Sequence, residues 1–124
     1  ENHLLVSSSG SRPVIFIREG NMQIFTGENK HSIGVMLRNR EREFSTVETT
    51  IRKGDSIYIF SDGYCDQFGG ISQEKFMADR FYKQLLNIQG LNMGEQEAEL
   101  DRVFEEWKSS NKQIDDILVI GIRV

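Results

Sequence analysis

The chain has 124 residues, a mass of 14.3 kDa and a formal charge of −4, and 38% of its residues are hydrophobic. This composition is typical of one globular, soluble domain and argues against a disordered segment. An acidic chain without a basic cluster argues against nucleic acid or an anionic membrane surface as the partner. No apolar run approaches the ~20 residues of a membrane span, and no signal peptide is visible, so we expect no direct membrane insertion. A single cysteine cannot form an internal disulfide, which fits a reducing compartment.

The first half of the chain has the pattern of short strands separated by turns. We predict strands over residues 3–7, 13–18, 22–26, 42–51 and 56–61. Gly20 lies between the second and third of these strands and marks a hairpin turn. Asp55 follows Gly54 in the turn before the fifth strand, and we interpret this aspartate as structural.

The second half of the chain has the periodicity of helices. Apolar residues three and four apart, including Phe81 and Leu85, predict a helix within residues 72–89. A second helix is predicted to begin at Asn92, because Glu95 three residues later completes the pattern of a capping box.

The last strand is predicted over residues 116–124. It is apolar on both faces from residue 117 to residue 120, as the central strand of a sheet would be. Strands followed by two helices and a return strand indicate an α+β fold rather than alternating βαβ units. Because the helices each have one apolar face, we expect them to flank the sheet.

Two short acidic signatures are the most informative feature of the sequence. The strand over 56–61 ends in Asp62-Gly63, and Asp115-Asp116 opens the last strand. If these strands are antiparallel neighbours, the end of one lies beside the start of the other, and the aspartates meet at one rim. Carboxylates gathered in this way repel each other unless they are protonated or bridged by a hard cation such as Mg²⁺ or Mn²⁺. The sequence therefore predicts a metal site, although Asp-Gly alone is more often an ordinary turn.

The residues from Gly54 to Gly63, from Asp115 to Val119 and around Pro13 together resemble a SpoIIE-type phosphatase domain. This family is the bacterial branch of the metal-dependent protein phosphatases, also called PPM or protein phosphatase 2C-like. Such domains occur as output modules of bacterial sensor and response-regulator proteins. The resemblance implies a β-sandwich with flanking α-helices. It also implies a binuclear Mn²⁺ or Mg²⁺ site and hydrolysis of phosphoserine or phosphothreonine by a metal-bridged water.

The resemblance also implies roles for individual residues. Asp62 and Asp115 match the family's metal ligands, and no catalytic residue beyond the ligands is implied. Asp116, Asp66 and Gly63 would lie next to the ligands and orient backbone or solvent. Two alternatives stay open: Asp115 and Asp116 exchange roles, or Asp66 is a solvated loop residue.

The family's first metal motif, an aspartate in an Asp-x-x-Gly-His-Gly-like segment, is absent from this sequence. The resemblance therefore implies that residues 1–124 are the C-terminal part of a single domain, truncated at its N-terminus. We expect one side of the metal cluster here and little or no activity from these residues alone. Sheet edges left without neighbours also predict self-association or a domain-swapped homodimer.

By the same resemblance, the substrate would be a regulatory phosphoprotein, such as an anti-sigma-factor antagonist. An upstream sensory or receiver domain in the same chain would control activity, and the expected location is cytoplasmic. The main alternative is a catalytically inactive pseudophosphatase that acts as a protein-interaction module. Ser9 and Ser11, where the family often has Gly and His, favour that alternative weakly. A binding domain of another α+β fold, with solvated acidic strand ends, is a third interpretation.

Overall fold

The computed structural model describes residues 2–7, 12–26 and 46–124. The chain divides into two compact units, residues 1–59 with 121–124 and residues 60–120. In the described part of the chain, no helix has the length and apolar composition that a membrane span requires. Ser9 and Ser11, which motivated the pseudophosphatase interpretation, lie outside the described residues.

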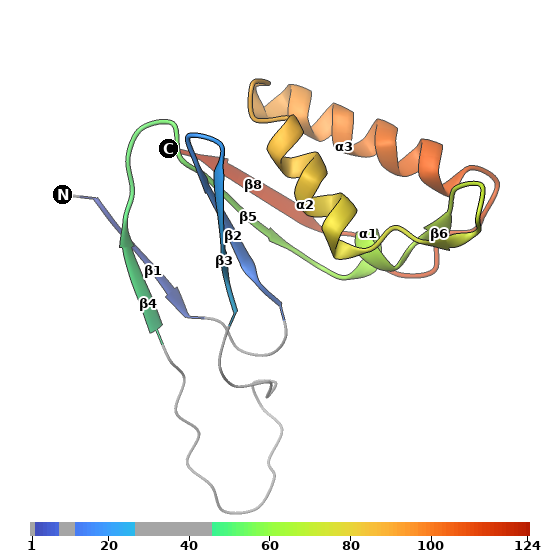
Figure 1. Cartoon of the computed structure of the whole chain (residues 1–124), viewed down its shortest axis with the longest axis horizontal. Helices are drawn as coiled ribbons and strands as arrows, with labels where there is room; N and C mark the ends of the chain where they lie inside the picture. The colour runs from blue at the N-terminus through green and yellow to red at the C-terminus, as the bar shows by residue number, and fades with distance from the viewer. Residues whose placement is uncertain (1, 8–11, 27–45) are drawn as a thin grey trace, which may run out of the picture. The chain divides into compact units, whose positions relative to one another are not determined.

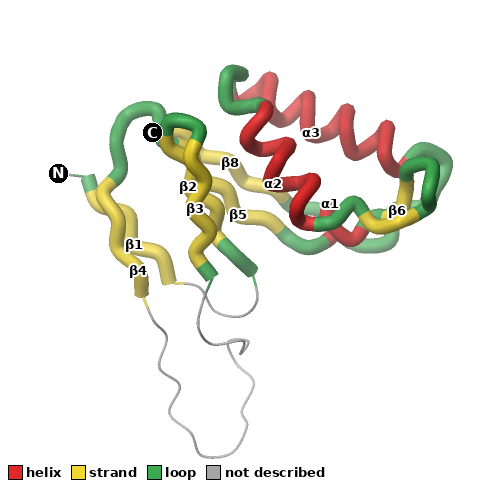
Figure 2. Tube along the Cα trace, viewed as in Figure 1, coloured by secondary structure: helices red, strands yellow, loops and turns green. Residues whose placement is uncertain are grey.

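The first unit is built from antiparallel strands (Figures 1 and 2). They are β1 (His3–Ser7), β2 (Val14–Arg18), β3 (Asn21–Phe25), β4 (Thr46–Thr50), β5 (Ser56–Phe60) and β8 (Val119–Arg123). β1 pairs with β4, and the remaining strands form a sheet in the order β3-β2-β5-β8. The predicted strands agree with these bounds to within two residues, with two exceptions. Residues 42–45 of the predicted fourth strand lie outside the described residues, and β8 begins three residues later than the predicted start at residue 116.

β2 is the buried centre of the first unit. Ile15, Phe16 and Ile17 are each at most 2% exposed, so both faces of this strand are covered. The hairpin to β3 turns through Glu19 and Gly20, which have φ angles of 49° and 77°. Two consecutive residues with positive φ are typical of the two-residue hairpin turn whose twist matches the flanking strands.

A partly buried ion pair holds the β4–β5 turn against the end of β2. The Asp55 side chain is 3% exposed, and its carboxylate accepts from Arg18 Nε at 2.9 Å and Nη2 at 2.6 Å. The Arg52 backbone N–H donates to the same carboxylate at 2.7 Å. These hydrogen bonds, that from Arg18 above all, hold the pKa of Asp55 below its ordinary value.

The position of β8 differs from the sequence-based expectation of a central strand. Among the described residues it is the last strand of its sheet, and Ile120 and Ile122 are 40% and 53% exposed. The sequence of residues 117–120 predicts that both faces of the strand are apolar, but it does not show which elements cover those faces. The expectation of a central strand was therefore wrong for the described sheet.

The second unit contains α1 (Gly63–Asp66), β6 (Phe68–Gly69), β7 (Glu74–Lys75), α2 (Ala78–Asn87) and α3 (Met93–Lys108). Its core is a cluster of aromatic rings in which Tyr64 packs against Phe76, Phe81 and Phe104 with centroid separations of 4.9 to 5.2 Å. The Tyr64 hydroxyl donates to the Leu100 carbonyl at 2.7 Å, which fixes this ring against α3.

The helix predicted within residues 72–89 begins later than expected. Residues 68–75 instead form the β6–β7 hairpin, and α2 begins only at Ala78. Just before α2, the Phe76 and Met77 N–H groups donate to the Gln67 and Cys65 carbonyls at 2.9 and 2.8 Å, and Met77 has a φ of 72°, which is not helical. The hairpin also packs tightly on α3, because a Cβ atom on Gly69 would lie 1.8 Å from the Trp107 carbonyl oxygen. Only a glycine backbone packs this closely against the end of α3.

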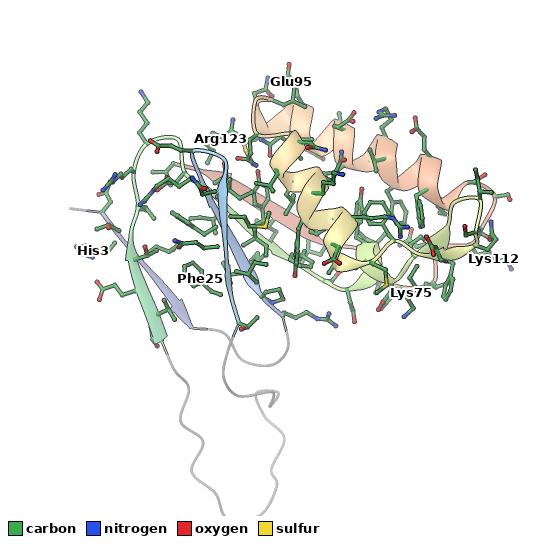
Figure 3. All side chains as sticks on the ribbon, in the orientation of Figure 1. His3, Phe25, Lys75, Glu95, Lys112 and Arg123 are labelled. Carbon is green, nitrogen blue, oxygen red and sulfur yellow. The ribbon has the colours of Figure 1, made fainter. Side chains whose placement is uncertain are left out.

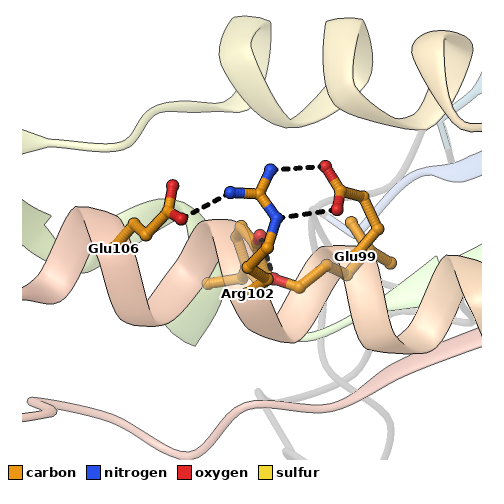
Figure 4. Close-up of polar contacts among 5 residues, drawn as sticks. Glu99, Arg102 and Glu106 are labelled. Atoms are coloured by element: carbon orange, nitrogen blue, oxygen red, sulfur yellow. Dashed lines mark hydrogen bonds and ion pairs between the residues drawn. The ribbon is translucent and has the colours of Figure 1, made fainter.

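The predicted start of α3 is confirmed. Asn92 Oδ1 accepts from the Glu95 N–H at 2.9 Å, and Glu95 Oε2 accepts from the Asn92 N–H at 2.9 Å, which completes a capping box. Further along the helix, Arg102 lies between Glu99 and Glu106 and bonds to both on the solvent-exposed face (Figure 4). Such i,i+3 and i,i+4 pairs support a helix modestly.

Candidate metal site

The two acidic segments lie side by side in the second unit. The Ser61 N–H donates to the Leu118 carbonyl at 2.9 Å. The Ser61 hydroxyl donates to the Asp116 carbonyl at 2.9 Å and accepts from the Leu118 N–H at 2.9 Å. The residue directly before Asp62 is therefore bonded to the backbone on both sides of Ile117, and the two segments adjoin where the strand-pairing argument placed them.

Gly63 makes this close approach sterically feasible. A Cβ atom at this position would lie 2.3 Å from the Asp116 carbonyl oxygen, a distance at which the backbone has to move. Asp62 is the N-cap residue of α1, and its carbonyl accepts from the Asp66 N–H at 2.9 Å. The Asp62 carboxylate is thus carried by a short, hydrogen-bonded turn pressed against the Asp116 backbone.

The aspartate pair is exposed and organised by local hydrogen bonds. Asp115 Oδ1 accepts from the Asp116 N–H at 2.8 Å, and the Asp115 carbonyl accepts from Gln113 Nε2 at 2.8 Å. Asp116 contacts Ser61 through its backbone carbonyl. One Asp115 carboxylate oxygen therefore points to the Asp116 N–H, and the Asp116 carbonyl bonds to the neighbouring segment through Ser61.

Asp66 lies one helical turn after Asp62 and forms an ion pair. Its Oδ1 is 3.0 Å from Lys75 Nζ of β7, and both side chains are partly exposed, at 38% and 42%. This partner connects α1 to the β6–β7 hairpin. Sequence reasoning offered a residue beside the site or a solvated loop residue and did not find the lysine, which comes from a hairpin that the sequence did not predict.

The carboxylates of the candidate site are the kind of ligand that binds a hard divalent cation, but too few of them lie together in the described part of the chain to complete its coordination. Asp62 and Asp115 supply carboxylate oxygens, the ligands that Mg²⁺ and Mn²⁺ prefer. An octahedral ion needs about six ligand atoms. Within residues 2–7, 12–26 and 46–124, no group of three or more His, Cys, Asp or Glu side chains is arranged to hold a metal ion. These residues can therefore form one side of a metal centre.

The sequence profile of the family described as Stage II sporulation protein E (SpoIIE) matches residues 1–124, the whole chain. The chain belongs to the SpoIIE family. The resemblance stated from the motifs is thereby confirmed. No curated protein matches the sequence.

Solved structures of phosphatase domains are similar to this SpoIIE-family chain. The SiaA-PP2C domain of Pseudomonas aeruginosa has a TM-score of 0.80 at 21% identity, with 97% of this chain and 46% of that one covered. The PP2C phosphatase domain of SpoIIE from Bacillus subtilis, solved with a fragment of its regulatory domain, has a TM-score of 0.69 at 19% identity, with 98% and 34% covered. The phosphatase domain of the same protein, in a crystal form without domain swapping, has a TM-score of 0.58 at 22% identity, with 98% and 49% covered.

These similarities establish the fold. The α+β architecture expected from the sequence is that of the PP2C-like phosphatase domains, with antiparallel sheets and a few helices. The chain spans less than half the length of each of the three solved chains described above.

Proposed function

We propose that this chain is part of a metal-dependent phosphatase domain that hydrolyses phosphoserine or phosphothreonine in proteins. The observation that carries the proposal is the junction of the Asp62 and Asp115-Asp116 segments through Ser61, in a chain of the SpoIIE family. The phosphatase domains with the same fold support it, and one of them is a SpoIIE crystal presoaked with Mn.

In this proposal Asp62 and Asp115 hold Mn²⁺ or Mg²⁺, and other residues fix the backbone that carries them. A bound pair of such ions supplies Lewis acidity, an activated water and charge compensation for phosphoryl transfer. Ser61 joins the two segments, Gly63 allows their close approach, and Asp116 contributes its backbone carbonyl. We propose that the remaining ligands come from other parts of the phosphatase domain, and that residues 1–124 alone therefore have little activity.

The wider context is also part of the proposal. The substrate is a regulatory phosphoprotein, such as an anti-sigma-factor antagonist, and a sensory or receiver domain in the same protein controls activity in the cytoplasm. Two findings support this context: membership of the SpoIIE family and the regulatory-domain fragment that accompanies one of the similar phosphatase domains.

A pseudophosphatase that acts as an interaction module is the second candidate. The observation that favours it is the donor set described above, which has fewer than three acidic, His or Cys side chains gathered in the described residues. Both candidates use the same fold and differ in whether a complete metal centre forms.

The test is Mn²⁺-dependent hydrolysis of a phosphoserine peptide by the full-length protein. We expect Asp62→Asn and Asp115→Asn each to lower kcat/KM at least about 100-fold. Replacing a residue that only orients a metal ligand lowers activity up to about 100-fold, and replacing the ligand itself should lower it at least as much. Asp101→Asn, on the exposed face of α3, is the matched control and should retain activity.

Full activity in Asp62→Asn would show that this residue is not a ligand. Absence of turnover by folded wild-type protein, across several phosphopeptides and with Mn²⁺ in excess, would favour the pseudophosphatase.

A further inference from the structure

The loop that carries Asp115 is tied to the segment after Asp62 by a second residue, Gln67. Its side chain is fully buried, at 0% exposed, directly after α1. Nε2 donates to the Phe68 carbonyl and to the Lys112 carbonyl, each at 3.0 Å. Lys112 lies three residues before Asp115 and is labelled near the β6–β7 hairpin in Figure 3.

The backbone of Gln67 is held as firmly as its side chain. Its carbonyl accepts from the Trp107 indole N–H at 3.0 Å and from the Phe76 N–H at 2.9 Å. The neighbouring Gly70 N–H donates to the Trp107 carbonyl at 2.9 Å. Gln67 therefore projects from a rigid base formed by the hairpin and the end of α3.

The loop itself has little packing to hold it in place. Residues 112–116 are all exposed, so burial of apolar surface contributes little to their position. Hydrogen bonds from the facing segment hold the loop at two points, from Gln67 to Lys112 and from Ser61 to Asp116. Asp115 lies between these two points, and Asp62 lies between Ser61 and Gln67 on the facing segment.

We propose that Gln67 is a positioning residue that sets Asp115 relative to Asp62, by fixing the loop at the Lys112 carbonyl. The inference rests on the proposed function and names a residue that the sequence motifs did not include. Burying this carboxamide costs free energy that an apolar side chain would not cost, because Gln67 Oε1 has no hydrogen-bond partner among the described residues. An apolar side chain of the same length would fill this space without leaving a buried oxygen unpaired. The advantage of glutamine at this position is therefore the two hydrogen bonds that its Nε2 donates.

The test compares Gln67→Met with Gln96→Met in the full-length protein. Gln96 is also buried, at 1% exposed, and its Nε2 donates to the Leu91 carbonyl at the start of α3, away from the Asp115 loop. Methionine matches glutamine in length and removes only the donated hydrogen bonds and the amide. Both variants should lose thermal stability to a similar extent, so thermal unfolding is the control for a purely structural role.

Two further readouts separate positioning from stability. We expect Gln67→Met to raise the Kd for Mn²⁺, measured by titration calorimetry, about 10- to 100-fold, the usual effect of removing a residue that orients a ligand. We also expect faster amide hydrogen exchange at residues 113–116 in the metal-free protein. Gln96→Met should change neither quantity.

Equal Mn²⁺ affinity in the two variants, or unchanged exchange at residues 113–116 in Gln67→Met, would overturn the positioning role. If Gln67→Met does not fold, Gln67→Asn keeps the carboxamide but is too short by one methylene to reach Lys112, and the same comparison applies. Absence of Mn²⁺ binding by the wild-type protein would instead overturn the proposed function, while the exchange measurement still tests the hydrogen-bonded link.

Discussion

Gly63 is the residue at which the candidate site tolerates least change. The space that a side chain would occupy is filled by the Asp116 backbone, 2.3 Å from an ideal Cβ. Asp62 directly precedes this contact, so a shift of either segment moves a proposed ligand. The glycine is required here for close approach between two strands of chain, and no positive φ is involved.

We predict that Gly63→Ala lowers the free energy of unfolding by about 1 to 3 kcal/mol, the usual cost of forcing extra atoms into a packed site. Urea denaturation of the full-length protein measures this change. Gly90→Ala is the matched control, because a Cβ at Gly90 meets nothing within 4 Å. Equal stability of the two variants would mean that the Asp116 segment moves aside easily.

At the scale of elements, the Arg18–Asp55 pair connects β2 with the turn between β4 and β5. Arg18 Nη2 also donates to the Thr50 carbonyl at 2.7 Å, so one guanidinium holds the ends of two strands and the turn. Because the pair lowers the pKa of Asp55, folding favours the ionised carboxylate. The stabilisation is present above the ordinary aspartate pKa and is lost as the pH falls through the lowered pKa of the folded state.

We predict that Asp55→Asn lowers the free energy of unfolding at pH 7 by about 1.5 to 3 kcal/mol, the range for hydrogen bonds to charged groups. The difference between variant and wild type should shrink as the solution is acidified, because the wild-type carboxyl becomes protonated. Urea titrations between neutral and acid pH measure both effects. Glu106→Gln, in the exposed Arg102–Glu106 pair of α3, is the control and should show little change, since exposed ion pairs contribute little. A difference for Asp55→Asn that stays constant with pH would contradict this account.

At the scale of the whole chain, β8 leaves apolar side chains uncovered. Ile120 and Ile122 point to the same face of the strand, and β8 is the last strand of the described sheet. An exposed apolar strand at the end of a sheet is a site for pairing with another chain.

We therefore predict that residues 1–124, as an isolated chain, self-associate. Sedimentation velocity at increasing concentration should show dimers or larger species. The double variant Ile120→Lys/Ile122→Lys should weaken this association, because two charges on an edge strand oppose pairing. Ile71→Lys is the matched control, since Ile71 is fully exposed at the β6–β7 turn, which belongs to a different sheet from β8. A monomer at all concentrations would contradict the prediction.

Features encoded by local sequence were predictable. The Glu19-Gly20 hairpin and the Asn92–Glu95 capping box depend on residues no more than three positions apart, and both are present where the sequence indicated. The order of strands and helices, with the two acidic motifs, was enough to identify the family. Local sequence patterns therefore indicated the fold class, and the family resemblance proposed Asp62 and Asp115 as candidate ligands.

Contacts between distant segments were decided only by tertiary structure. The β6–β7 hairpin, which replaced the start of a predicted helix, packs through Gly69 against Trp107, 38 positions along. The bonds from Ser61 to Asp116 and from Gln67 to Lys112 span 55 and 45 positions. Ser61 lies within the first acidic motif and Gln67 lies outside it, but neither sequence position shows which backbone carbonyl the fold places within 3 Å of its side chain. The sequence thus proposed which carboxylates bind a metal, and the tertiary structure decided how the backbone around them is held.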